Sequence, residues 1–373
     1  MAATSQKFPS GKRERQPIGD RLALSHQRTC ALPKKVLLES YGYYMSNEPA
    51  KEPQPTLVSL FSGCGGMDLG FKLSGYEVLW ANDFNADAGK TYTRNFGDHM
   101  HVGSIQDFDL SQLPKADVIA GGFPCQDFSM IWKRGGIETE RGNLYTYFVE
   151  AVRQVQPKIF VAENVKGLLT ANGGKAIERI VRDFEELGYK THTKLYNFAE
   201  YGAPQLRERV LIIGFRKDLD IDFQPPTPSH TPENFVSAGE ALLGVEKVPH
   251  NNELINIKER TKRILELIPE GKNFSAIPKD SDYYVKGMIS HVYRRLDRNK
   301  PSTTIIAGGG GGTWGYHFEH PRPLTNRERA RLFGYPDDFV FEGSVTEVRR
   351  QIGNSVPPVA AKAIASHLRK YLD

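Results

Sequence analysis

The strongest constraint on the fold is a strand-turn-helix-strand pattern that starts at residue 56. Residues 56–61, TLVSLF, form a short apolar run typical of a buried strand, and a glycine-rich turn follows at 61–67, FSGCGGM. After a helical stretch, residues 76–83, YEVLWAND, predict a second strand that ends in an acidic residue. A strand, a helix and a second strand in this order begin a sheet that is covered by helices.

The same alternation continues along the chain. Residues 116–122, 158–164 and 209–215 are further apolar runs of strand length, bounded by Gly, Pro or polar residues. Between them, residues 176–187 repeat apolar side chains at helical spacing, and Gly188 offers a stop for that helix before another strand. The pattern predicts an α/β fold with a doubly wound sheet.

This regularity ends near residue 216 and returns near residue 325. The stretch between is rich in Pro, Asn, Gly and charge, with one clear helical pattern at 254–268. Thr325 and Glu328 then have the spacing of a capping box, and an amphipathic segment closes the chain. We therefore predict four parts: a basic extension at 1–54, an α/β domain at 55–216, a smaller irregular domain at 217–324, and a segment at 325–373 that completes the α/β domain.

The first part is distinguished by its charge. Residues 1–37 hold eight Lys or Arg against Glu14 and Asp20. Two interpretations stay open: a solvated tail, or an arm that binds a DNA backbone by releasing counterions. The whole chain has a formal charge of +5, which permits a polyanionic partner without requiring one.

The cysteines and the N-terminus bear on location. Cys30, Cys64 and Cys125 are far apart, match no metal-ligand spacing and cannot form an even set of disulfides, which favours a reducing compartment. The first residues lack an apolar signal core, and no apolar run is long enough to span a bilayer. We expect a cytoplasmic protein with no membrane partner and no metal, and a monomer by default.

Several chemically useful residues follow the predicted strands. Gly63 and Gly65 would let a nucleotide-type cofactor approach the backbone, and Asp83 could accept hydrogen bonds from ribose hydroxyls; a merely tight turn is the alternative. Cys125 lies in the loop after residues 116–122, where a thiol is a candidate nucleophile, although a lone cysteine is more commonly a small buried hydrophobe. Cys64 lacks that setting, and we predict that it only fills space.

A carboxylate and two arginines complete the candidates. Glu163 ends the run at 158–164, and without an adjacent cation its carboxyl could keep a raised pKa and donate a proton. Arg207 and Arg209 alternate in the segment QLRER and could project on one face toward a phosphate or a carbonyl oxygen. Their ordinary alternatives are a capping carboxylate and a solvated run of charge.

Five short segments together resemble a known family. FSGCGG, GFPCQ, ENV, QLRER and GNSVPP occur in the order seen in bacterial-type DNA (cytosine-5)-methyltransferases. The resemblance covers residues 56 to about 216 and 321–373, and chance agreement at five ordered segments is negligible. It implies the Rossmann-like fold of S-adenosylmethionine-dependent methyltransferases, with residues 217–324 as the target recognition domain.

The resemblance also implies which residues bind S-adenosylmethionine. The family's acidic residue before Ile105, which meets the adenine amino group, is Ser104 here, so that contact is in doubt and Asp107 is a possible substitute. The implied cofactor residues are Phe61, Gly63, Gly65, Asp83, Ile105, Asn354, Ser355 and Val356.

For the chemistry, the resemblance implies a covalent mechanism on DNA. Cys125 would add to carbon 6 of a cytosine that is flipped out of the duplex, because carbon 5 is too weak a nucleophile to take a methyl group unaided. Glu163 and Arg209 would stabilise the charge pushed onto the ring, with Arg207 supporting their loop.

The DNA contacts implied come from two regions. Residues 129–142, with their basic side chains and glycines, would close over the DNA, and the glycine-rich stretch after Thr304 would face a groove. The alternative for the five consecutive glycines at 308–312 is a flexible linker. Arg298 is a further candidate for reading bases or phosphates. The expected DNA-binding residues are Pro124, Gln126, Ser129, Arg141, Gln205, Arg294, Arg295, Thr304, Gly309 and Gly310.

The predicted activity is therefore sequence-specific methylation of double-stranded DNA, within a restriction-modification system whose endonuclease is a functional rather than a physical partner. A tRNA cytosine-5 methyltransferase would share the chemistry. A catalytically silent DNA-binding relative would be expected to lack Cys125 or Glu163, and a nicotinamide oxidoreductase would leave both without a role. The sequence leaves the recognition site and the role of the extension open.

Overall fold

The structure is a computed structural model that describes residues 54–124, 144–288, 292–308 and 315–372. All of these belong to one compact unit, Tyr41–Asp373. The basic extension predicted at 1–54 lies almost entirely outside the described residues. Within the described part of the chain, no helix is long and apolar enough to cross a membrane.

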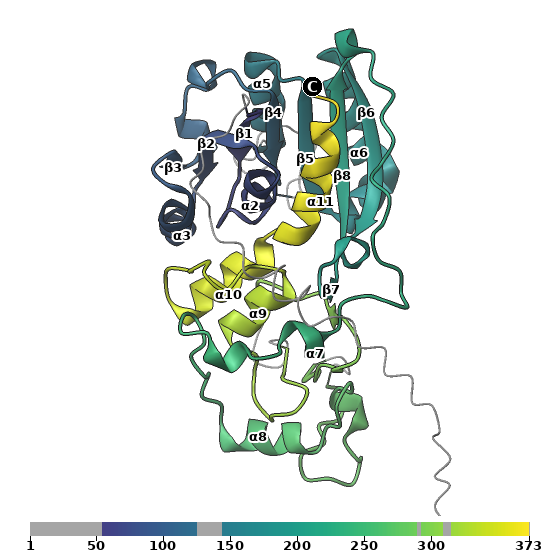
Figure 1. Cartoon of the computed structure of the whole chain (residues 1–373). Coiled ribbons are helices and arrows are strands. Elements are labelled where there is room, and N and C mark those ends of the chain that lie inside the picture. The colour runs from purple at the N-terminus through teal and green to yellow at the C-terminus, as the bar shows by residue number, and fades with distance from the viewer. Residues whose placement is uncertain (1–53, 125–143, 289–291, 309–314, 373) are drawn as a thin grey trace, which may run out of the picture. The chain divides into compact units, whose positions relative to one another are not determined.

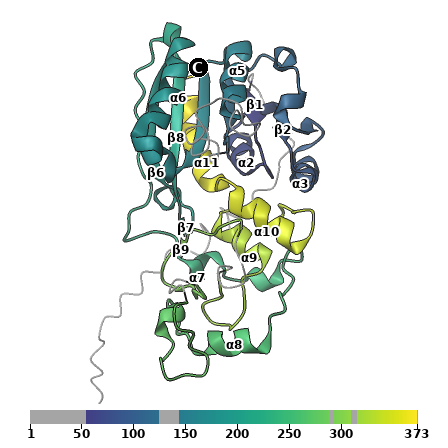
Figure 2. The ribbon, with the colours of Figure 1, turned by 180° about the vertical axis from the view of Figure 1, so that it is seen from behind.

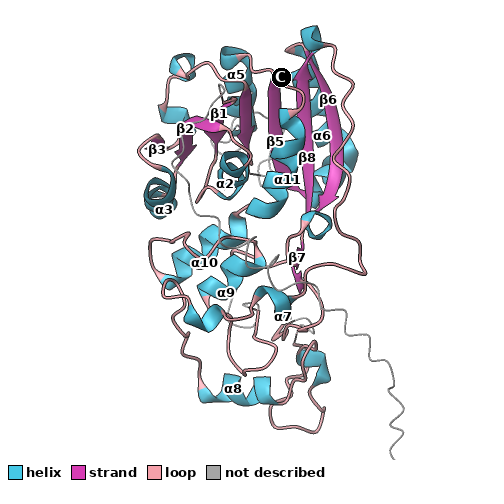
Figure 3. Ribbon diagram, in the orientation of Figure 1, coloured by secondary structure: helices cyan, strands magenta, loops and turns pink. Residues whose placement is uncertain are grey.

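The centre of this unit is a seven-stranded sheet with the order β3-β2-β1-β4-β5-β8-β6 (Figures 1 and 3). The five strands from β3 to β5 are parallel, and β8 is antiparallel to both of its neighbours. The strands are β1 (Thr56–Leu60), β2 (Glu77–Asp83), β3 (Met100–Val102), β4 (Val118–Gly121), β5 (Ile159–Val165), β6 (Tyr189–Asn197) and β8 (Glu208–Arg216).

Helices cover both faces of the sheet, as a doubly wound fold requires (Figures 1 and 2). Alternate strand residues face opposite sides, so Ile119 and Phe160 pack with α5 (Leu144–Val155) and α6 (Lys175–Glu186). Their neighbours Val118 and Ile159 pack with α2 (Gly66–Leu73) and α11 (Pro358–Arg369) on the other side. The α/β prediction is confirmed. The antiparallel β8 follows from a short connection between β6 and β8, which leaves no room for a crossover helix.

The remaining elements are short. Helix α3 (Ala86–Phe96) follows β2, while α9 (Asn326–Leu332) and α10 (Val345–Asn354) precede α11. Residues 217–324 are mostly loop, as predicted (Figure 3). The helical pattern at 254–268 forms a helix only over α8 (Glu259–Glu266). Residues 217–324 also contain the short helix α7 (Ala238–Ala241), three 3-10 helices of three residues each, and β9 (Ser302–Thr303), which pairs with β7 (Gln205–Leu206).

Two local predictions are confirmed. The Thr325 side chain accepts a hydrogen bond from the Glu328 backbone, and the Glu328 carboxylate accepts one from the Thr325 backbone, so the capping box is complete. Helix α6 ends at Glu186, and Gly188 has a φ of 89°, a left-handed conformation that favours glycine.

A buried carboxyl group lies beneath the glycine-rich turn. Asp68, in the first turn of α2, accepts hydrogen bonds from the Ser59 hydroxyl at 2.7 Å and the Tyr92 hydroxyl at 2.7 Å. Burial raises the pKa of this carboxyl to about 6, although both hydroxyls lower it. Above pH 6 the Asp68 carboxyl is therefore ionised in the core, and this buried charge destabilises the fold.

This predicts a pH-dependent effect of the substitution Asp68→Asn. Because the folded pKa is raised, the stabilising contribution of Asp68 is complete below about pH 4 and is lost as the pH rises through 6. Compared with the wild type, Asp68→Asn should therefore have a free energy of unfolding that is shifted toward higher stability by up to about 3 kcal/mol at pH 8 relative to pH 4, because each pKa unit corresponds to about 1.36 kcal/mol. Urea unfolding at both values measures this gain. Asp117→Asn is the control of opposite sign, because the pKa of Asp117 is lowered by its hydrogen bonds and by Lys158. An equal effect of Asp68→Asn at both pH values would contradict the prediction.

Candidate active site

The predicted site residues gather at one edge of the sheet. The parallel strands β1, β2, β4 and β5 end at this edge, so the segments that follow them meet there. These segments are the turn after Leu60, the acid Asp83, the loop after Gly121 and the pair Glu163 and Asn164. The order of the strands in the sheet, rather than their order in the sequence, thus brings these segments to the same edge.

The glycine-rich turn is held by the acid at the end of β2. The Gly63 backbone donates to Asp83 Oδ2 at 2.8 Å, and the Asn85 backbone donates to Asp83 Oδ1 at 2.9 Å. Phe61, Gly63 and Gly65 all have positive φ values, which turn the chain sharply into α2. Burial raises the pKa of Asp83. Each carboxylate oxygen keeps a second lone pair, so Asp83 can hold the turn and still accept a bond from a ligand.

The segment after α10 closes on the same turn. A Cβ atom on Gly66 would lie 1.9 Å from Ser355 Oγ and 2.4 Å from the Val356 carbonyl oxygen. Ser355 Oγ is 2.5 Å from the Tyr335 hydroxyl, which lies 3.2 Å from Cys64 Sγ. Burial raises the pKa of the Cys64 thiol to about 12, so this cysteine stays neutral, as its predicted space-filling role requires.

This close approach predicts that Gly66→Ala weakens cofactor binding. The added methyl group must push residues 355–356 away from the turn, and overpacking of this kind costs roughly 1–3 kcal/mol, or about 5- to 150-fold in affinity. Calorimetric titration with S-adenosylhomocysteine measures the change. Gly167→Ala is the control, because a Cβ atom there has no neighbour within 4 Å. Equal affinities of the two variants would contradict the packing role of Gly66.

The remaining cofactor candidates differ in exposure. Asn354 is exposed at the end of α10, whereas Ile105 is buried in the core against the sheet. Asp107, the suggested substitute for the missing acid, is exposed. The sequence analysis missed Phe84, which directly follows Asp83 and is 74% exposed. An aromatic residue next to a strand-end acid was the available signal, because a flat apolar ring there can stack on a planar base.

Glu163 and Arg209 form an ion pair across β5 and β8. Arg209 Nε lies 2.8 Å from Glu163 Oε1, and the side chains are only 13% and 12% exposed. The expectation that Glu163 has no adjacent cation is therefore wrong, because the antiparallel register sets Arg209 opposite Val165, two residues from Glu163. Burial still raises the pKa of Glu163, although Arg209 and Arg207 lower it. Burial therefore has a larger effect on the pKa of this carboxyl than the two cations beside it.

The loop that carries the expected nucleophile starts beside this pair. A Cβ atom on Gly122 would lie 2.7 Å from Glu163 Oε2, so a larger residue there would displace the Glu163 carboxylate. Asn164 donates from its buried amide to the Phe123 carbonyl oxygen at 3.0 Å. Pro124, which is exposed, is the last described residue of this segment. Cys125, Gln126, Ser129 and Arg141 lie outside the described residues, as do Gly309 and Gly310 in the second region.

A cleft of about 480 Å³ opens next to the ion pair. It is lined by Arg209 and by the neighbouring pair Lys166 and Glu208, whose charged atoms are 2.9 Å apart. Thr304 also lines it, and its hydroxyl donates to the Leu206 carbonyl oxygen at 2.7 Å. The cleft therefore connects Arg209, one of the expected catalytic residues, with Thr304 of the expected recognition segment.

Two predicted DNA contacts, Gln205 and Arg295, have other roles in the structure, and Arg207, which was expected to support the loop, is buried beside Gln205. Gln205 and Arg207 are fully buried and bonded within the protein, so neither reaches a ligand directly. Arg295 donates five hydrogen bonds to the carbonyl oxygens of Leu265, Ile268, His317, Phe318 and Glu319. Its expected base contact is therefore corrected to a structural role. Arg298 pairs with Glu270, whereas Arg294 is half-buried.

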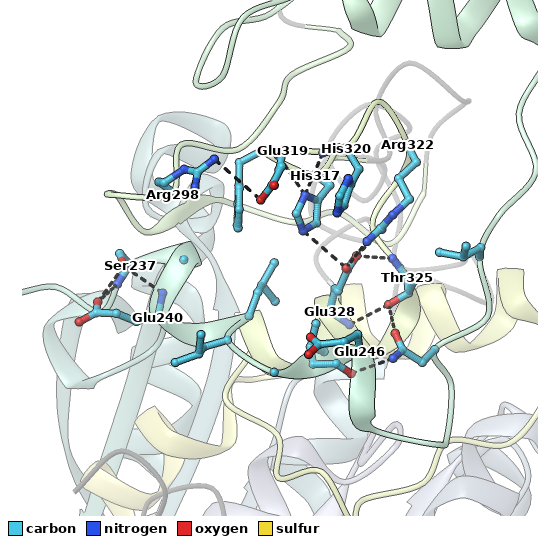
Figure 4. Close-up of a pocket in the computed structure, with 18 of the residues that line it drawn as sticks. Ser237, Glu240, Glu246, Arg298, His317, Glu319, His320, Arg322, Thr325 and Glu328 are labelled. Carbon is cyan, nitrogen blue, oxygen red and sulfur yellow. Dashed lines mark hydrogen bonds and ion pairs between the residues drawn. The ribbon is translucent and has the colours of Figure 1, made fainter. Parts of the chain in front are cut away.

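A larger hollow of about 830 Å³ lies elsewhere, between α7, residues 317–322 and the start of α9 (Figure 4). Its buried Glu328 pairs with Arg322 and completes the capping box, while Glu240 caps α7 (Figure 4). None of the five motif segments lines it, so its size alone does not make it the active site. Among the described residues, no group of His, Cys, Asp and Glu could hold a metal ion.

Comparison with known proteins shows that the chain is similar to DNA methyltransferases. The chain is 56% identical to the type II methyltransferase M.NgoFVII of Neisseria gonorrhoeae, over 87% of this chain and 89% of that protein. It is 40% identical to M.BbvI of Brevibacillus brevis, a type II methyltransferase, over 83% and 90% of the two chains.

The solved structures show the same fold. A protein encoded within an E. coli prophage, assigned as a DNA modification methyltransferase, superposes with a TM-score of 0.67 at 26% identity, over 86% of this chain and 99% of that one. DNMT2 of Spodoptera frugiperda has a TM-score of 0.56 at 18% identity, over 86% and 99% of the chains, which shows the fold alone. The sequence profile of the C-5 cytosine-specific DNA methylases matches residues 56–370. The chain therefore belongs to the C-5 cytosine-specific DNA methylase family.

Proposed function

We propose that this DNA (cytosine-5)-methyltransferase acts on a cytosine extruded from double-stranded DNA and held by a covalent bond to Cys125. The observation that carries the proposal is the buried pair of Glu163 and Arg209 beside the start of the Cys125 loop. A proton donor and a fixed cation at one point suit a ring that gains negative charge on a nitrogen and an oxygen.

The family uses S-adenosylmethionine, and the residues present fit it. Asp83 would accept from the ribose hydroxyls, the exposed ring of Phe84 would stack on the adenine, and the exposed amide of Asn354 lies on the segment that closes against the turn. When bound, this cofactor supplies an electrophilic methyl group. The open space around Gly63 supports a ligand position there, because a Cβ atom would have no neighbour within 4 Å.

In the proposed mechanism, the Cys125 sulfur forms a bond to carbon 6 of the cytosine. The electron pair of the 5,6 double bond then makes carbon 5 nucleophilic, while Glu163 donates a proton at ring nitrogen 3 and Arg209 donates a hydrogen bond to oxygen 2. Carbon 5 would take the methyl group as the bond between that group and the cofactor sulfur breaks, and would then lose its own proton to a base. The electron pair left on carbon 5 re-forms the 5,6 double bond, the Cys125 sulfur leaves carbon 6 as a thiolate, and ring nitrogen 3 returns its proton to Glu163.

The target must leave the duplex, because a stacked base cannot reach the buried pair. Extrusion costs a few kcal/mol, which contacts from residues 125–143 and from the Thr304 segment would offset. Residues 217–324 would serve as the target recognition domain, with Arg294, Gly309 and Gly310 as remaining candidates for DNA contact.

Restriction-modification is the proposed setting, because the relatives that match most of this chain are type II methyltransferases. The endonuclease of such a system would recognise the same sequence without contacting this protein. No observation favours tRNA as the substrate. The test is to incubate unmethylated plasmid DNA with the enzyme and S-adenosylmethionine, digest it to nucleosides and identify 5-methyldeoxycytidine. Bisulfite sequencing then gives the recognition site, and absence of the modified nucleoside would refute the proposal.

A further inference from the structure

Three segments that are distant in the sequence meet at Ile305. Gln205 Oε1 accepts from the Ile305 backbone N–H at 3.1 Å, and Arg207 Nη1 donates to the Ile305 carbonyl oxygen at 3.2 Å. Arg207 Nη2 donates to the Gly353 carbonyl oxygen at 2.9 Å. Both sides of Ile305 are thus held by the β7–β8 link, which is itself bonded to the end of α10.

The backbone of residues 306–307 also packs directly against Gly353 in α10. A Cβ atom on Gly353 would lie 2.4 Å from the backbone of Ala307 and 2.7 Å from the Ile306 carbonyl carbon. No side chain separates the two segments. A displacement of residues 305–307 would therefore be felt at Gly353 and at Asn354, which follows it.

Arg207 is costly to bury, and its geometry explains its presence. The side chain is fully buried, lies 5.0 Å from the ring centre of Phe333 and has no carboxylate bonded to it among the described contacts. Burial lowers the pKa of the guanidinium to about 9, so it stays charged at neutral pH. A planar guanidinium can bridge two carbonyl oxygens in fixed directions, which a lysine cannot do.

We propose that Gln205 and Arg207 are positioning residues that couple the cofactor segment 354–356 to the recognition segment 304–308, so that cofactor and DNA strengthen each other's binding. This inference rests on the proposed function of the two segments. It assigns no direct ligand contact to Gln205 or Arg207, and it explains why two polar side chains in a DNA-modifying site are sealed from solvent. Coupling between two sites is reciprocal, so it can be measured from either ligand.

The first test measures the affinity for S-adenosylhomocysteine with and without a duplex that carries the recognition site found by bisulfite sequencing. In the wild-type enzyme, the duplex should raise this affinity about 5- to 150-fold. In Arg207→Lys the ratio should fall to within about twofold of one, because a single ammonium nitrogen cannot take the places of both guanidinium nitrogens that bond to Ile305 and Gly353. Gln205→Met, which removes both amide bonds at similar size, should lower the ratio as well.

The matched control is Arg295→Lys. Arg295 also bridges several carbonyl oxygens, but none of them belongs to segments 304–308 or 353–356. Its substitution should lower the melting temperature and leave the ratio unchanged. A ratio that survives Arg207→Lys, or that Arg295→Lys reduces equally, would overturn the inference.

A second test needs no variant. Hydrogen exchange of the wild-type protein should slow in residues 302–307 when S-adenosylhomocysteine binds alone, and should not change in residues 265–272, which Arg295 anchors. Unchanged exchange in 302–307 would overturn the coupling even if the substituted proteins do not fold. If either test fails while the wild-type enzyme still transfers methyl groups, the coupling is refuted and the proposed function stands. If the wild-type enzyme transfers no methyl groups, the proposed function itself is refuted.

Discussion

Glu163→Gln is expected to lower the rate of methyl transfer about 10²- to 10⁴-fold, the usual contribution of a positioned acid. Glutamine keeps the shape of the side chain and can donate a hydrogen bond, but it cannot give a proton to ring nitrogen 3. Burial holds the pKa of Glu163 above its ordinary value despite Arg209 at 2.8 Å, so the wild-type carboxyl is suited to that task. Steady-state rates with labelled S-adenosylmethionine measure the loss.

The control for this prediction is a similar ion pair away from the cleft. Asp337 accepts from Arg331 at 2.7 Å, with side chains 34% and 11% exposed. Asp337→Asn should reduce the stability of the fold but change the rate of methyl transfer by less than about threefold. The reason is that losing a part-buried ion pair lowers the fraction of folded enzyme only slightly. Affinity of Glu163→Gln for S-adenosylhomocysteine should stay close to that of the wild type. A wild-type rate in Glu163→Gln would exclude Glu163 as the acid.

Cys125→Ser should abolish the covalent step. A serine hydroxyl is not ionised at neutral pH and attacks carbon 6 far more slowly, so the rate should fall on the order of 10⁴-fold or more. With duplex DNA that carries 5-fluorocytosine at the target, the wild type should form an adduct that survives denaturing electrophoresis, because fluorine on carbon 5 cannot leave as a proton does.

The other cysteines allow a clean comparison in the same experiment. Cys30→Ser should form the adduct at the wild-type level, since Cys30 lies in the basic extension and outside the matched family region. Cys64 is buried and its thiol stays neutral, so it cannot replace Cys125. An adduct in Cys125→Ser, or its loss in Cys30→Ser, would show that the nucleophile has been assigned to the wrong cysteine.

The sheet and the edge at which the site lies could be predicted from the sequence. Short apolar runs mark the strands, and a motif that follows a parallel strand must lie at the carboxyl edge. This reasoning predicts that Gly63, Asp83 and Glu163 each lie at or just after the end of a strand, at the edge where a ligand would bind. The same logic predicted Cys64 as buried, because it lies within the turn instead of in a loop beyond it.

Strand register and burial set the limits of that prediction. Arg209 lies 46 positions after Glu163, and only the antiparallel β5–β8 register brings their charges together. The alternation of Arg207 and Arg209 predicted one shared face. The structure instead buries Arg207 beneath Ile305, since Arg207 lies between two strands and not within one. The prediction that Arg295 contacts DNA was wrong for a related reason. A basic residue in a loop-rich domain can stabilise the loops by donating hydrogen bonds to their carbonyl oxygens.

The central claim is tested most directly by the transfer of labelled methyl groups from S-adenosylmethionine to unmethylated duplex DNA and, in parallel, to tRNA. The account predicts label in the duplex, recovered as 5-methyldeoxycytidine, and none above background in tRNA. Label only in tRNA, or in neither nucleic acid, would contradict it.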